Sequence, residues 1–168
     1  MVQAYNFLAS WQLFPEKGAY EKGDRPKSGI YKIEAVEGKK ELRIFHNWLS
    51  LENQAFASNY TILADGDLHP LPESEGADKV QALFPDGITF EIHFYRGGQT
   101  ILHVVHEIMP NGYLRVTQQG ELENGQAYTN MEYYHKQMSV LPYAASVSGA
   151  VIRPTEEGMI KHKALTAM

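Results

Sequence analysis

The chain of 168 residues contains no cysteine. A disulfide framework, a thiolate metal site and a cysteine nucleophile are therefore excluded, and cysteine usage says nothing about the redox compartment. An excess of basic charge is also absent, because 15 Lys and Arg residues against 20 Asp and Glu residues give a net charge of -5. With no basic surface to meet phosphates, we expect no nucleic-acid partner.

Long apolar runs and recognisable catalytic motifs are missing as well. The sequence has no stretch of about 18 apolar residues and no charged leader followed by an apolar run, so it predicts no membrane span and a cytoplasmic location. It also has no Gly-x-Ser-x-Gly elbow, no phosphate-binding glycine loop and no His-Glu-x-x-His pair. The sequence therefore implies no cofactor, and an enzyme is not the leading expectation.

Short runs of alternating hydrophobicity, separated by turn residues, are abundant. This pattern is typical of antiparallel sheets and barrels. The clearest case is the segment 111–137, in which two alternating runs flank the turn Glu123-Asn124-Gly125. The predicted strands are 29–36, 41–48, 56–63, 79–84, 88–95, 100–109, 113–119, 128–137 and 146–153.

Two sets of residues carry a resemblance to a known group of proteins. The first set is Trp11, Leu13, Pro15, Lys17, Tyr20, Gly23, Pro26 and Ser28, and the second is Thr117, Gly120, Gly125, Asn130, Tyr134, Lys136 and Gln137. At this spacing the chain resembles small bacterial lipocalin-like (calycin) β-barrel proteins, mostly of unassigned function. The resemblance implies an all-β fold, a single antiparallel lipocalin-like β-barrel.

Helical segments are expected only at the two ends of the chain. Residues 3–11 carry apolar side chains three apart, which predicts a short helix that plugs one end of the barrel. Residues 155–166 begin after Pro154 with two glutamates and end with basic residues, which predicts a second helix. Its weak apolar stripe leaves a homodimer open. We expect one domain over residues 1–168, with the barrel at about 7–153.

The interior of such a small barrel is wide enough for side chains or one small ligand. We expect it to bind a small apolar or aromatic molecule, since ligand pockets are mostly apolar with a few placed polar groups. The expected ligand-binding residues are Trp48, His46, Ile92, His103, Arg115 and Tyr134. For Trp11, by contrast, the resemblance implies a structural role at the barrel end, with Arg115 or Lys136 packed across its ring.

The resemblance also bears on the kind of ligand. Fatty-acid-binding proteins, distant relatives of this architecture, hold a carboxylate with an Arg-x-Tyr pair near the chain end. The matching positions here are Glu132 and Tyr134. An acidic residue repels a carboxylate, so fatty-acid binding is not implied, and Arg115 is the nearby cation.

The pairing of the strands 88–95 and 100–109 has two alternatives. A two-residue turn at Gly97-Gly98 places Ile92 opposite His103, whereas a three-residue turn pairs His93 with His103. His103 and His106 point to opposite faces, so we expect no bound metal. The second pairing, together with Glu91 or Glu107, leaves a zinc or iron site open.

Two rival functions stay open beside ligand binding. One is a lyase or isomerase of the same fold, with an acid/base site built from Glu91, His93, Tyr95 and His106. The other is a structural or self-association protein whose barrel is filled by its own side chains. Large aromatic side chains in the interior favour the filled barrel, and a cavity with polar groups favours the first two functions.

Overall fold

The computed structural model describes residues 4–37, 40–71 and 76–137. Nearly all regular structure in these ranges is β-strand. The strands are β1 (Ala9–Leu13), β2 (Ala19–Tyr20), β3 (Ser28–Ala35), β4 (Glu41–Leu49), β5 (Ala55–Leu63), β6 (Leu68–Pro70), β7 (Lys79–Asp86), β8 (Thr89–Arg96), β9 (Gln99–Ile108), β10 (Leu114–Glu121) and β11 (Ala127–Lys136). Two single turns of 3-10 helix are η1 (Tyr5–Phe7) and η2 (Pro15–Lys17).

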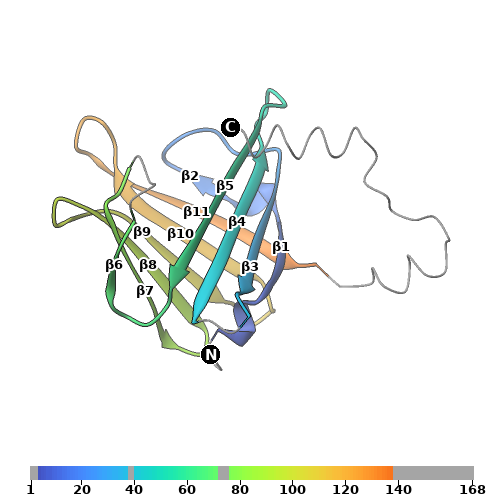
Figure 1. Ribbon diagram of the computed structural model, residues 1–168. Coiled ribbons are helices and arrows are strands. Elements are labelled where there is room, and N and C mark those ends of the chain that lie inside the picture. The colour runs from blue at the N-terminus through green and yellow to red at the C-terminus, as the bar shows by residue number, and fades with distance from the viewer. Residues whose placement is uncertain (1–3, 38–39, 72–75, 138–168) are drawn as a thin grey trace, which may run out of the picture.

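The strands form one antiparallel sheet that curves around a common interior (Figure 1). Its order is β5-β4-β3-β1-β11-β10-β9-β8-β7-β6, and β2 adds to β11. Within the described ranges the ladder is open only between β5 and β6. Near that gap the Gln81 side chain donates to the Gly66 carbonyl over 2.7 Å, and the Gly66 N–H donates to the Ala82 carbonyl over 2.9 Å. The predicted all-β antiparallel barrel is confirmed, in the up-and-down order of lipocalin-like barrels.

Most predicted strands are present with small shifts at their ends. Eight of the nine predicted strands match β3, β4, β5 and β7–β11 with ends within two residues of the prediction. The short strands β1, β2 and β6 were missed, because two to five residues are too few to show alternation. The predicted strand 146–153 and helix 155–166 lie outside the described residues.

The helix predicted at residues 3–11 is wrong. Only Tyr5–Phe7 forms a helical turn, and Ala9–Leu13 is a strand that pairs with β3 on one side and β11 on the other. Pairing on both sides satisfies the backbone of this segment and closes the barrel, which overrides its local helical pattern. The expected plug nevertheless exists, since Phe7 from the turn is fully buried.

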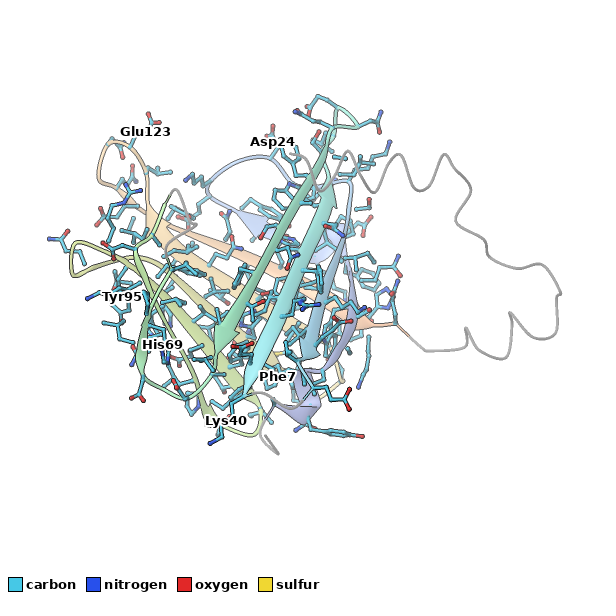
Figure 2. All side chains as sticks on the ribbon, viewed as in Figure 1. Phe7, Asp24, Lys40, His69, Tyr95 and Glu123 are labelled. Carbon is cyan, nitrogen blue, oxygen red and sulfur yellow. The ribbon has the colours of Figure 1, made fainter. Side chains whose placement is uncertain are left out.

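One end of the barrel is filled by aromatic side chains. Phe7 packs against Phe84 and Phe90 at ring-centroid distances of 5.7 and 5.9 Å, and Phe84 stacks on Phe90 at 4.5 Å. Figure 2 shows Phe7 at this end and Asp24 and Glu123 at the opposite one. We call these the closed end and the open end. Any ligand site inside the barrel therefore lies toward the open end.

The hairpin of β8 and β9 takes its register from a bulge. The turn has the two residues Gly97 and Gly98, both with positive φ, but the register shifts between Phe94 and Tyr95. His93 consequently lies opposite His103, and Ile92 lies opposite Val104. The pairing expected for a three-residue turn thus arises from an irregularity in the strand, which a count of turn residues cannot reveal.

Candidate functional site

A cavity of about 290 Å³ lies inside the barrel on the open-end side of the filled core. Its apolar lining includes Phe94 from β8 and Leu102 and Val104 from β9. Strand alternation places these side chains on the inner face, because residues two apart on a strand share a face. The cavity is near the lower limit of typical ligand pockets and suits a molecule of one or two rings.

The polar lining comes mainly from the opposite wall. His46 on β4, Ser58 and Tyr60 on β5, and Gln118 on β10 all line the cavity. Among the described residues that line it, none is an Asp, Glu, Lys or Arg. The cavity thus offers neutral hydrogen-bonding groups within an apolar wall.

His46 joins the cavity to a buried acidic group. Its Nε2 lies 3.4 Å from the Tyr134 hydroxyl, which donates to Glu132 Oε1 over 3.2 Å. The Tyr20 hydroxyl donates to the other oxygen of Glu132 over 2.8 Å. Burial is the main reason that the pKa of Glu132 is raised and that the pKa of His46 is lowered to about 4. His46 is therefore neutral at neutral pH and available as a hydrogen-bonding group.

A second chain of polar groups fixes the other buried histidine. His106 Nδ1 lies 3.0 Å from the Phe90 carbonyl, so this nitrogen carries the proton, and the Tyr31 hydroxyl donates to Nε2 over 2.8 Å. Tyr31 lines the cavity together with Tyr60. Burial lowers the pKa of His106 to about 4 and raises that of Tyr60 to about 12. The chain leads from the β8 backbone to a hydroxyl at the cavity wall.

Four of the six residues expected to bind ligand face the interior. His46 lines the cavity. Trp48 lies two residues further along the same strand face, with its ring 4.7 Å from the imidazole and stacked on Phe56. Tyr134 is fully buried beside His46, and Ile92 is fully buried in the core. Only His46 of these four is in the cavity wall.

The other two expected residues, His103 and Arg115, lie on the outer face, so their placement in the interior is wrong. Arg115 forms an ion pair with Glu107, with an Nη2–Oε2 distance of 2.7 Å. His103 is followed by Val104 and Arg115 by Val116, and both valines are buried and point inward. Because neighbours on a strand point to opposite faces, His103 and Arg115 point outward. The barrel wall separates both from the cavity.

The alternative acid/base set is not assembled either. Glu91, His93 and Tyr95 share the outer face of β8, whereas His106 is fully buried inside the barrel. His106 is held by Phe90 and Tyr31 and does not line the cavity. The four groups cannot act on one substrate, because the sheet lies between them.

Several cavity residues were not predicted from the sequence. Tyr31, Ser58, Tyr60 and Gln118 come from β3, β5 and β10, which are distant in the chain. Alternation identifies each as an inward residue of its strand, but it does not show which inward residues meet one another. Register between strands supplies that information, as in the pairing of Tyr31 with His46.

These features define a class of protein: an antiparallel β-barrel with one end filled by aromatic side chains and a cavity behind the other. Among the described residues, no helix has the length and apolar character to cross a membrane. No known family and no curated protein matches the chain.

Solved structures resemble the chain only distantly. One is a redesigned β-barrel, with a TM-score of 0.43 and 11% identity, covering 81% of this chain and 96% of the other. Another is the siderocalin Ex-FABP, which functions through dual ligand specificities, with a TM-score of 0.38 and 15% identity, covering 88% of this chain and 81% of the other. The cavity itself is therefore the basis on which a function can be proposed.

Proposed function

We propose that this protein binds a small, uncharged, largely apolar or aromatic molecule in the cavity at the open end of the barrel. The observation that carries the proposal is the space of about 290 Å³, which has apolar walls and a few neutral polar groups. Such a composition is typical of ligand pockets, where apolar contacts supply affinity and placed polar groups orient the molecule.

The charges around the cavity favour a neutral ligand. Glu132 lies beyond His46 and Tyr134, and no cation in the described lining offsets it. A carboxylate ligand would lose its hydration without gaining a counter-ion, which is costly in a buried site. A phenol or an amide keeps one hydrogen bond with His46, Ser58 or Tyr60 at no such cost.

The filled-barrel alternative describes one part of the interior and not the other. Phe7, Phe84 and Phe90 fill the closed end, whereas Phe94 lines open space. The proposal is restricted to that space. The cytoplasmic location and the homodimer expected from the sequence are further proposals that rest on the sequence alone.

A pair of related probes tests both the site and its preference for neutral molecules. Binding of 1-naphthol and of 1-naphthoate is measured by the change in thermal unfolding temperature over a range of probe concentrations. A ligand that binds only the native state stabilises it by RT ln(1 + [L]/Kd). We expect 1-naphthol to raise the unfolding temperature and 1-naphthoate to have a much smaller effect at pH 7.

Two adjacent valines on β9 give a matched pair of variants. Val104 is 4% exposed and lines the cavity, whereas the side chain of Val105 points to the outer face. We expect Val104→Phe to abolish the shift caused by 1-naphthol and Val105→Phe to retain it. Equal shifts in both variants would place binding outside the cavity. No shift in the wild-type protein with any neutral aromatic probe would favour the filled-barrel alternative.

A further inference from the structure

A cluster of two imidazoles and one carboxylate lies on the outer face of the barrel. Glu91 and His93 are two residues apart on β8, and His103 lies directly opposite His93 on β9. Because residues two apart on a strand share a face, all three side chains project from the same side of the hairpin. The cluster does not involve the interior cavity.

The distances between the donor atoms suit a tetrahedral metal ion. Glu91 Oε2 lies 3.2 Å from His93 Nε2 and 3.4 Å from His103 Nε2, and the three donor atoms lie within 4.8 Å of one another. Ligands about 2.0–2.1 Å from a zinc ion at tetrahedral angles are separated by about 3.4 Å. The two imidazole rings are stacked at 4.1 Å with an interplanar angle of 14°, so both present Nε2 to the same region.

Hydrogen bonding within the protein satisfies only part of this cluster. His93 Nε2 is hydrogen-bonded to Glu91 Oε2, but His103 Nε2 is buried and forms no hydrogen bond with any described residue. A buried polar atom without a partner normally costs free energy or marks a missing ion or water. One cation bound between the three donors would satisfy all of them.

We propose that Glu91, His93 and His103 form a binding site for a zinc ion on the outer face of β8 and β9. Two imidazoles and a carboxylate are a ligand set that zinc accepts, and such sites leave a fourth position for water. The three side chains are 23–26% exposed, so an ion can reach the cluster from solvent.

The surroundings of the cluster support an open coordination position. Gln81 on β7 lies beside His93, and Gln119 on β10 lies beside His103. Both side chains are neutral amides, and Gln81 is already bonded to the Tyr95 hydroxyl and the Gly66 carbonyl. Among the described strands, the residues directly opposite the three ligands in these registers include no lysine or arginine.

This proposal revises the expectation of no bound metal. That expectation rested on the opposite directions of His103 and His106, which the structure confirms. The bulge at Phe94 and Tyr95 supplies His93 in place of His106 as the second imidazole. A zinc ion here would link β8 to β9 on the outside, while Phe94, Leu102 and Val104 of the same strands line the cavity.

Zinc titration of the chelator-treated full chain tests the site. Isothermal titration calorimetry with ZnCl2 is expected to show one ion per chain, and zinc is expected to raise the thermal unfolding temperature. Cobalt in place of zinc should give the intense visible absorption of a tetrahedral complex. Each variant Glu91→Gln, His93→Ala and His103→Ala should weaken zinc binding by more than about 100-fold, which exceeds the loss expected for residues that only hydrogen-bond to a ligand.

His69→Ala is the control, because His69 pairs with Asp65 away from this cluster and should leave zinc affinity unchanged. Circular dichroism of each variant checks that the barrel is intact. Zinc binding that is unchanged in His103→Ala and Glu91→Gln would assign the ion to other residues and overturn the proposal. A wild-type chain without one tightly bound zinc ion would overturn it equally.

Discussion

At the scale of single residues, Trp11 illustrates how one side chain closes an end of the barrel. It is 1% exposed, and its indole N–H donates to the Phe7 carbonyl over 3.0 Å. The Lys136 ammonium lies 5.8 Å from its ring centroid. The structural role predicted for Trp11 is thus confirmed, and of the two basic residues considered it is Lys136 that covers the ring.

The two tryptophans should differ sharply in their effect on stability. Trp11→Ala removes a large buried side chain and is expected to lower the free energy of unfolding by about 3–5 kcal/mol. Trp48 is only partly buried, and Trp48→Phe keeps an aromatic ring against Phe56, so its cost should stay below about 1.5 kcal/mol. Urea unfolding followed by circular dichroism measures both. The reverse order would contradict the assignment of the closed end.

At the scale of elements, the Asn130 amide makes three hydrogen bonds between β11 and the connection from β2 to β3. Asn130 Oδ1 accepts hydrogen bonds from the backbone N–H groups of Glu21 and Lys22 at 2.9 and 3.0 Å, and its Nδ2 donates to the Lys22 carbonyl at 2.9 Å. Asn130 is 9% exposed, so these partners replace water around it. The connection is long and its other residues are mostly exposed, which makes this contact decisive for its position.

Removing this amide should loosen the connection without unfolding the barrel. We expect Asn130→Ala to lower the free energy of unfolding by about 1–3 kcal/mol, since it removes three hydrogen bonds made by a largely buried side chain. Trypsin should then cut faster after the exposed residues Lys22 and Lys27. Thr129→Ala, on the opposite face of the same strand, serves as the control. Equal cleavage rates in the two variants would show that Asn130 does not hold this segment.

At the scale of the whole molecule, stability depends on keeping two interior histidines uncharged. Burial lowers the pKa of both His46 and His106 to about 4, against an ordinary value of about 6.5. Between these values the unfolded chain binds more protons than the folded one, so stability falls as the pH falls from 6.5 toward 4. Glu132 has the opposite effect on the pH dependence of stability. Because its pKa is raised in the folded protein, stability falls as the pH rises above the range in which a carboxyl group ordinarily ionises.

The unfolding free energy should therefore decrease on acidification across this window. Each histidine contributes a slope of at most about 1.4 kcal/mol per pH unit. We expect His46→Gln to reduce the slope by about the contribution of one histidine. Urea unfolding at several pH values between 4 and 7 measures the slope. A slope that is unaltered in His46→Gln would show that this imidazole is not held neutral.

The sequence by itself determined the strand content and most strand bounds, and it separated the side chains of each long strand into two faces. These features are local, because alternation and turn residues act over a few positions. Thus His46, Tyr134 and Ile92 were correctly expected inside, and Trp11 was correctly expected in the core. The outward direction of Arg115 also follows from alternation with its buried neighbours. It was expected inside because it is the nearby cation that could meet a carboxylate ligand.

Only the tertiary structure decided which faces meet and where space is left. The bulge in β8 and β9 pairs His93 with His103, and the double pairing of Ala9–Leu13 turns an expected helix into a closing strand. The separation of a filled end from a hollow end depends on how Phe7, Phe84 and Phe90 pack together across the barrel. Register, closure and packing are contacts between residues distant in the chain, so the pattern within one strand cannot specify them.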